Sequence, residues 1–187
     1  MTTYLDWKRW ASIATGCAVL AAQPSVAAGL VPAVSSASVE FGASEKKTKL
    51  VRFGVQSNWD KRWLQSNGTH LGGYWDLTLS KWYSDGNAGG TQNVTDIGIT
   101  PVFRFQRDNK KGGYLEGGIG LHRLSDIYYN GNIKLSTRFQ FGDHLGVGYV
   151  FDNMGELAVK IQHFSNGGYK KPNGGINFLV LKASYPF

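Results

Sequence analysis

Apolar and polar residues alternate with a period of two through most of this 187-residue chain, and that pattern limits its fold more than any other feature. Side chains on a β-strand point to opposite faces in turn, so alternation predicts strands with one apolar and one polar face. Leu157, Val159 and Ile161, for example, share one face of a predicted strand. Eight such segments are predicted between turns rich in Gly, Asn and Asp: 36–44, 48–59, 71–83, 94–107, 113–124, 133–151, 156–165 and 178–187.

Two all-β architectures fit eight alternating strands in a single domain. A soluble barrel or sandwich would bury the apolar face, whereas an outer-membrane barrel turns that face to lipid and encloses the polar one. Strand lengths near ten residues, aromatic residues near strand ends and the aromatic terminus of "LVLKASYPF" favour the membrane barrel. An open sheet would leave unsatisfied backbone groups in lipid. The predicted fold is therefore an eight-stranded antiparallel transmembrane β-barrel of the bacterial outer membrane.

The polar face is expected to line a barrel that is too narrow for a channel. Among its charged members, Asp76, Arg104, Glu116 and Arg138 are expected to pair with opposite charges inside the barrel, in a structural role. The residues of this face are Arg52, Gln56, Asp76, Ser80, Arg104, Gln106, Glu116, Arg138, Gln140, Lys160 and Gln162.

Residues 1–28 are predicted to be a cleaved signal peptide. The basic segment "MTTYLDWKRW" precedes an apolar run, "ASIATGCAVLAA", that is too short to span a bilayer. Small residues in "SVAAG" then offer a cleavage site after Ala27 or Ala28. The only cysteine, Cys17, lies in this segment, so the mature domain, 29–187, is predicted to use neither disulfides nor thiol chemistry.

The stretch "HFSNGG" places two polar residues on an otherwise apolar face. His163 and Ser165 continue the phase of the apolar residues of 156–165, so they should face lipid. Outer-membrane barrels keep both termini in the periplasm, so the seventh of eight strands ends at the outer surface. Residues two apart on a strand are neighbours, and an imidazole there can take the proton of a serine nucleophile. The same pattern also fits a strand end among lipid headgroups, so H-x-S alone decides nothing.

The chain resembles the PagL-type lipid A 3-O-deacylase family over most of the predicted mature protein. The segments that carry the resemblance, in family order, are "NWDKRW", "LGGYWD", "TPVFRF", "YLEGGIG" and "HFSNGGYKKPNGG". The last is the most specific, because its His-x-Ser-Asn and downstream Pro-Asn coincide with the catalytic motif of the family. The resemblance implies an outer-membrane barrel that hydrolyses the ester of the 3-hydroxyacyl chain at position 3 of lipid A, without a cofactor or metal.

The resemblance also implies roles for individual residues. Ser165 would be the nucleophile of a serine esterase and His163 its general base. Asn166 would support the site. The backbone N–H of Gly168 and the side chain of Asn173 would stabilise the oxyanion.

One position departs from the family pattern. The family usually has a glutamate where this chain has Asn177. An amide oxygen can accept the imidazole Nδ1–H and fix the tautomer, but it cannot neutralise the imidazolium, and Asp→Asn in this role of a serine protease costs about four orders of magnitude in rate. Two acids near the other end of the strand, Asp152 and Glu156, lie about 20 Å or more from His163. Asn177 is therefore expected to orient His163.

The resemblance implies lipid A, or lipopolysaccharide, as the substrate, with the active site facing the outer leaflet. Two rival functions stay open: a non-catalytic structural or adhesive barrel, and a lipid A acyltransferase. The formal net charge is +7, but no block of Lys and Arg is long enough to predict nucleic-acid binding. Lys46, Lys47, Lys170 and Lys171 in external loops could meet lipid A phosphates or form a solvated rim. The sequence leaves the oligomeric state open, with a homodimer among the options.

Overall fold

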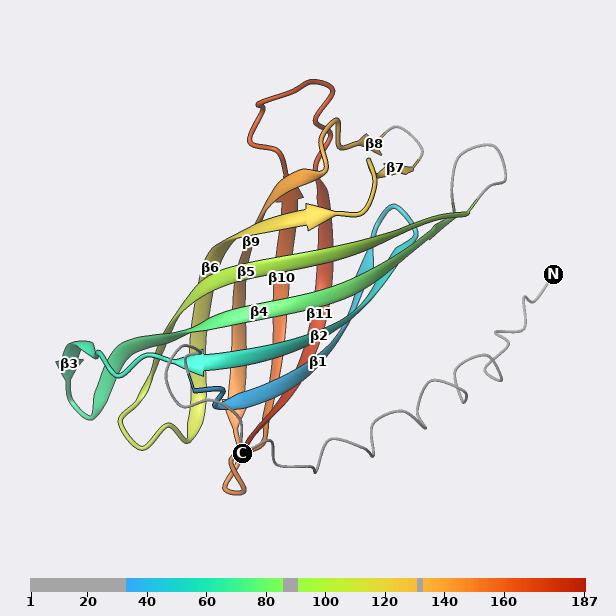
Figure 1. The fold of residues 1–187 in the computed structure, drawn as a ribbon. Helices are drawn as coiled ribbons and strands as arrows, with labels where there is room; N and C mark the ends of the chain where they lie inside the picture. Colours follow the sequence, from blue (N-terminus) through green and yellow to red (C-terminus); the bar gives the residue numbers. More distant parts are fainter. Residues whose placement is uncertain (1–32, 86–90, 131–132) are drawn as a thin grey trace, which may run out of the picture. The chain divides into compact units, whose positions relative to one another are not determined.

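The computed structural model describes residues 33–85, 91–130 and 133–187 (Figure 1), and the predicted signal peptide lies outside them. Within these residues, no helix has the length and apolar character needed to cross a membrane. The strands are β1 (Ser36–Ser44), β2 (Thr48–Asn58), β3 (Trp63–Ser66), β4 (Thr69–Asp85), β5 (Thr91–Arg107), β6 (Gly112–Leu124), β7 (Tyr129–Asn130), β8 (Ile133–Lys134), β9 (Phe139–Val150), β10 (Glu156–Ser165) and β11 (Ile176–Pro186).

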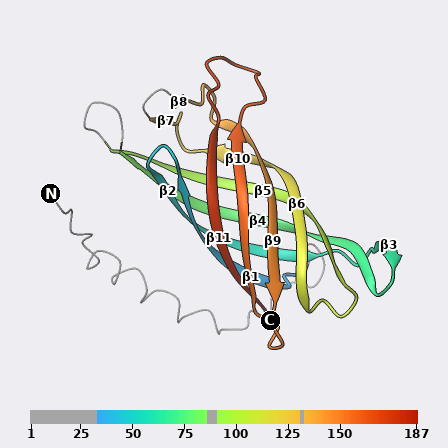
Figure 2. The same ribbon diagram turned by 180° about the vertical axis from the view of Figure 1, so that it is seen from behind.

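The eight long strands form a closed antiparallel barrel (Figure 1). Neighbours follow the order β2-β1-β11-β10-β9-β6-β5-β4, and β2 pairs with β4 to close the sheet. Seen from behind, β10 lies between β9 and β11 (Figure 2). Closure gives each long strand a partner on both sides, as a lipid environment requires. The predicted eight-stranded outer-membrane barrel is confirmed.

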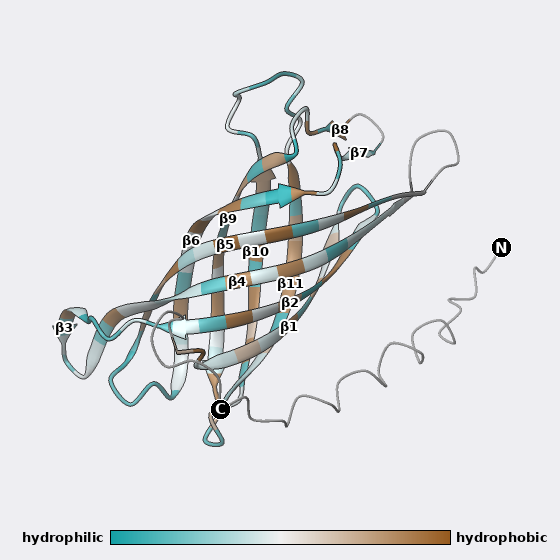
Figure 3. Ribbon diagram, viewed as in Figure 1, coloured by the Kyte–Doolittle hydropathy of each residue, from teal (hydrophilic) through white to brown (hydrophobic). Residues whose placement is uncertain are grey.

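The outer face of the barrel wall is apolar. Bands of apolar and polar residues alternate along the strands (Figure 3). The exposed large side chains of this face include Phe53, Leu77, Leu79, Ile97, Ile99, Phe103, Leu115, Leu121, Leu145, Val147, Leu157, Val159, Ile161, Leu179 and Leu181. Soluble proteins rarely expose apolar patches of this extent. The outer wall is therefore the lipid-facing surface.

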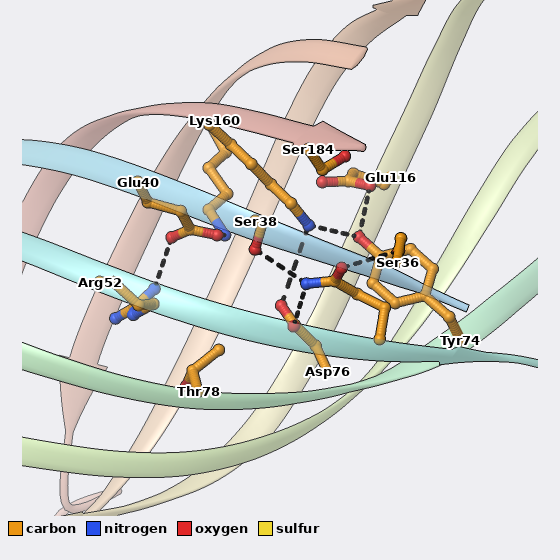
Figure 4. Close-up of polar contacts among 12 residues, drawn as sticks. Ser36, Ser38, Glu40, Arg52, Tyr74, Asp76, Thr78, Glu116, Lys160 and Ser184 are labelled. Atoms are coloured by element: carbon orange, nitrogen blue, oxygen red, sulfur yellow. Dashed lines mark hydrogen bonds and ion pairs between the residues drawn. The ribbon is translucent and has the colours of Figure 1, made fainter. Parts of the chain in front are cut away.

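The barrel interior holds a network of buried charges, part of which is drawn in Figure 4. Glu40 accepts hydrogen bonds from Arg52 at 3.0 Å and from Lys160 at 2.7 Å. All three side chains are almost completely buried. Because each cation shares the same carboxylate, Glu40 is the residue on which the charge balance of this part of the interior depends.

The predicted ion pairs inside the barrel are present at three of the four expected positions. Arg104 donates to Glu116 at 2.8 Å, and both side chains are buried. The carboxylate of Asp76 lies 3.9 Å from the ammonium of Lys182. Charges on the inward face of different strands thus neutralise one another across the barrel.

The prediction that Arg138 pairs with an acid inside the barrel is wrong. The prediction of a single strand over 133–151 is wrong as well. Arg138 is exposed and lies 3.5 Å from Asp126, just before β9 begins. The strand is interrupted because Leu135 is fully buried in an apolar cap and pairs with Asn173 through an isolated bridge. In the sequence, Leu135 has the same phase as the lipid-facing residues of β9, so alternation does not distinguish a buried cap residue from a lipid-facing one.

An apolar cluster fills the end of the barrel where β10 ends. The ring of Trp82 lies 4.8 Å from that of Phe164 and 5.0 Å from that of Phe178, centre to centre. The members of the cluster are Leu50, Trp82, Val94, Leu124, Tyr128, Ile133, Leu135, Phe164, Ile176, Phe178 and Val180. Since Phe164 is held inside, the strand geometry turns its neighbours His163 and Ser165 outward.

Replacing Glu40 tests the importance of the interior charge balance. Glu40→Gln should lower the free energy of unfolding by about 3 kcal/mol, because Lys160 would remain buried without its carboxylate partner and Arg52 would keep only Asp96, at 3.7 Å. The measurement is guanidinium unfolding in detergent micelles, followed by tryptophan fluorescence. Asp152→Asn removes an acid whose side chain is 99% exposed, so it should change stability by less than about 0.5 kcal/mol. Equal effects of the two substitutions would contradict the assignment.

Candidate active site

His163 and Ser165 lie on the outer face of β10, close to its C-terminal end. Both side chains are half-buried. Phe164, which lies between them in the sequence, and Gln162, which precedes His163, are buried inside the barrel. This end of β10 leads into the loop to β11, at the opposite end of the barrel from the chain's C-terminus (Figure 2). The polar pair thus interrupts the apolar outer wall at one rim of the barrel.

Strand register brings Asn177 to His163. The two residues are direct partners in the β10–β11 ladder, and Nδ1 of His163 lies 2.7 Å from Oδ1 of Asn177. An amide oxygen can only accept a hydrogen bond, so Nδ1 carries the ring proton. In the neutral ring, Nε2 is then left with a free lone pair, which is the state that a general base requires.

Gly175 gives the His163 ring its space. Its φ is +62°, a region that favours glycine. A Cβ at this position would lie 2.6 Å from Cε1 of His163, so any side chain would displace the ring. The sequence analysis missed this residue, and the only sign of it was the second glycine of "PNGG", which also reads as ordinary turn punctuation.

The loop between β10 and β11 is organised by Asn166, which is 1% exposed. Its Oδ1 accepts from the N–H of Gly168 at 3.0 Å, and its Nδ2 donates to the carbonyl of Lys170 at 2.7 Å. Its backbone N–H donates to Oδ1 of Asn173 at 3.1 Å. This last bond orients the amide of Asn173 and leaves its NH₂ group as a donor for another acceptor.

Ser165 lies beside this loop. Its Oγ accepts a weak hydrogen bond of 3.4 Å from the N–H of Gly167. No hydrogen bond joins Ser165 to His163 in the described part of the chain. Catalytic hydrogen bonds often tighten only when substrate binds. The relevant geometry is therefore that His163 and Ser165 lie two residues apart on the same face of β10.

The segment between β6 and β9 supports the loop from its other side. Ser136 donates to the carbonyl of Pro172 at 2.6 Å. Next to it, Leu135 forms the bridge to Asn173. The sequence analysis missed this support, because contacts between two loops leave no local pattern.

A groove of about 690 Å³ crosses the outer wall beside His163, over β5, β6, β9 and β10. It lies where Gly117, on the outward face of β6 between Phe103 and Leu145, presents no side chain. Phe103, Ile119, Asp143, Leu145, Ile161 and His163 are among its lining residues. An apolar groove that ends at a histidine suits an acyl chain whose reactive end is polar.

The rim around the site carries exposed cations. Lys170 and Lys171 lie in the β10–β11 loop, and Lys46 and Lys47 lie between β1 and β2. Such lysines attract anionic lipid headgroups. Among the residues that the structure describes, no group of three or more His, Cys, Asp or Glu side chains could hold a metal ion.

Comparison with known proteins gives consistent matches. The family model for lipid A 3-O-deacylase (PagL) matches residues 49–186. Lipid A deacylase PagL of Pseudomonas aeruginosa is 33% identical over 169 residues, 90% of this chain and 95% of that protein. Lipid A deacylase PagL of Bordetella bronchiseptica is 28% identical over 183 residues, 94% and 92% of the two chains. The crystal structure of the outer membrane enzyme PagL is similar with a TM-score of 0.71 and 29% identity, covering 81% of this chain and 99% of that one.

The contact between His163 and Asn177 predicts a measurable tautomer. Long-range ¹H–¹⁵N spectra of histidine-labelled protein in micelles should show His163 with its proton on Nδ1, since Asn177 Oδ1 accepts it. Asn177→Ala should remove this preference, while Asn58→Ala, at an exposed position on another strand, should leave it unchanged. A ring protonated on Nε2 in the unaltered protein would show that Asn177 does not orient it.

Proposed function

Because the chain belongs to the lipid A 3-O-deacylase (PagL) family, we propose that it hydrolyses the 3-hydroxyacyl ester at position 3 of lipid A as a serine esterase of the outer membrane. The observation that carries the mechanism is the 2.7 Å contact between His163 Nδ1 and Asn177 Oδ1, on the same face as Ser165. It leaves Nε2 as the base beside a hydroxyl, which is the arrangement that nucleophilic ester hydrolysis needs.

The reaction proceeds in two steps. Ser165 Oγ attacks the ester carbonyl while His163 Nε2 takes the serine proton. When the tetrahedral intermediate collapses, the sugar 3-oxygen leaves with the proton from His163, and the acyl group stays on Ser165. Water, deprotonated by His163, then attacks the acyl-enzyme, releases the 3-hydroxy fatty acid and restores Ser165.

Two donors of the β10–β11 loop are proposed to stabilise the oxyanion. Asn173 would supply its NH₂ group, since Asn166 N–H occupies its Oδ1. Gly168 would supply its backbone N–H, which must first leave the side-chain oxygen of Asn166. A preorganised oxyanion donor commonly contributes about 3 kcal/mol to transition-state stabilisation, and Asn173 is the one of the two that is already oriented.

The location of the site supports a substrate that arrives within the membrane. His163 and Ser165 face lipid at the barrel end that we assign to the outer leaflet, where lipid A resides, and the opposite end carries the C-terminus. Exposed lysines at this rim would meet its phosphates. Residues 1–28 would direct the chain to export and be removed.

Lipid A mass spectrometry tests the proposal. Cells that express the unaltered protein should lose one 3-hydroxyacyl chain from lipid A. Ser165→Ala and His163→Ala should reduce this deacylation by about a thousandfold or more, because each removes a member of the nucleophilic pair. Ser57→Ala, on the outer face of β2, is the matched control and should behave like the unaltered protein.

Three outcomes would contradict the proposal, provided that heat-modifiable gel migration shows each barrel folded. A lipid A that gains an acyl chain would indicate an acyltransferase. Unchanged lipid A with the unaltered protein would indicate a structural or adhesive barrel. Full activity of Ser165→Ala would show that another group is the nucleophile.

A further inference from the structure

A second groove, of about 350 Å³, lies on the outer wall over β5 and β6, away from the candidate active site. Its apolar lining comes from Phe105 and Leu115, which are direct partners in the β5–β6 ladder and are exposed on the outward face. Gly113 also lines it, and a Cβ there would meet nothing closer than the carbonyl oxygen of Gly148, at 4.0 Å. Its φ is not positive, so its backbone conformation does not require glycine either. The missing side chain leaves an opening in the wall that the packing of the barrel does not explain.

The groove lies at the end of the barrel that carries the C-terminus. The strand ladders connect Gly113 through Tyr149 of β9 and Leu157 of β10 to Ala183, near the end of the chain. Aromatic rings gather at the same level, where Tyr149 lies 5.3 Å from Phe151, centre to centre. Such residues concentrate at the level of the lipid headgroups. Because we assign the opposite end to the outer leaflet, the lipid that meets this groove belongs to the inner leaflet.

Arg107 supplies a cation at the edge of the groove. It lies two residues beyond Phe105 on the outward face of β5, where it pairs with Thr69 of β4 and is exposed. Within 33–85, 91–130 and 133–187, its side chain makes neither a hydrogen bond nor an ion pair. The acid that follows it, Asp108, lies 2.9 Å from Nδ1 of His70 instead. The guanidinium group of Arg107 is therefore available to an anion from the membrane.

The turn that follows β5 adds positive charge beside Arg107. Lys110 and Lys111 both lie in this turn, and Lys111 is 3.3 Å from the exposed carboxylate of Asp152. Lys110 forms no ion pair with any residue that the structure describes. Cations thus remain in excess at this rim, and such clusters next to a membrane attract anionic headgroups.

We propose that this groove binds an anionic phospholipid of the inner leaflet, with an acyl chain against Phe105 and Leu115 and the phosphate on Arg107. The planar guanidinium group can donate two parallel hydrogen bonds to a phosphate. An apolar groove alone would accept any acyl chain, and a cation alone would accept any phosphate, but the two together select a lipid that carries both. The site is independent of the proposed deacylation, because it lies at the other end of the barrel from Ser165.

Native mass spectrometry of the folded barrel in dodecylmaltoside, titrated with palmitoyl-oleoyl-phosphatidylglycerol, tests the proposal. The unaltered protein should retain one such lipid. Arg107→Gln should weaken its binding by about tenfold, because the charge-assisted hydrogen bonds are lost, and Gly113→Leu should do the same by filling the groove. Arg123→Gln is the matched control and should bind like the unaltered protein, since Arg123 is an exposed cation on the outward face of β6 at the opposite end.

A set of related probes identifies what the groove recognises. Dioleoylglycerol, which lacks a phosphate, and sn-glycerol 3-phosphate, which lacks acyl chains, should each bind at least about tenfold more weakly than phosphatidylglycerol. Zwitterionic phosphatidylcholine should bind at least about threefold more weakly, because the rim attracts net negative charge.

Four results would overturn the proposal. Equal binding of dioleoylglycerol and phosphatidylglycerol would indicate only the ordinary lipid layer around a barrel. Glycerol 3-phosphate binding as tightly as the lipid would indicate a site for free phosphate, and phosphatidylcholine binding as tightly would show that net charge has no role. A loss in Arg123→Gln as large as that in Arg107→Gln would indicate unspecific attraction by a basic protein. If heat-modifiable migration shows that Gly113→Leu does not fold, Arg107→Gln and the set of probes still decide.

Discussion

The demand of lipid for satisfied backbone hydrogen bonds governs this structure. A sheet in a bilayer must close, and β2 closes this one by pairing with β4. In a closed barrel, each residue faces either the interior or the lipid, and a slip of one residue would exchange the two faces. The same register that turns Leu157 and Val159 to lipid also turns His163 and Ser165 there. The position of the site is thus a consequence of the barrel.

The interior supports the outer wall in two different ways. Toward the end that carries the C-terminus, buried charges such as Glu40 and Arg52 pair across strands. At the other end, Phe164 and Trp82 belong to an apolar cluster beneath the site. A rigid interior suits the proposed site on the outer wall, because side chains proposed to be catalytic need supports that the substrate cannot displace. The loops add the bridge from Leu135 to Asn173.

Much of the fold followed from local sequence, and the failures have a common cause. The segments 36–44 and 156–165 are strands with the predicted bounds, because alternation reports directly on a wall with two unlike faces. The predicted strand 133–151 is wrong, because an apolar residue in a cap and one facing lipid look alike in sequence. The motif drew attention to His163 and its expected contact with Asn177, which the structure contains. The neighbours of His163 that come from other strands and loops, Asp143 and Gly175, were missed, because pairing between distant segments leaves no local signal.

A crystal structure of the protein after reaction with a long-chain alkylphosphonate ester tests most directly whether Ser165 acts on lipid from the outer wall. The phosphonate should be joined to Oγ of Ser165, with an oxygen near Asn173 Nδ2. Its alkyl chain should lie on the outside of the barrel, in the groove lined by Phe103 and Leu145. A folded protein without an adduct at Ser165, or one whose chain enters the barrel interior, would contradict the mechanism.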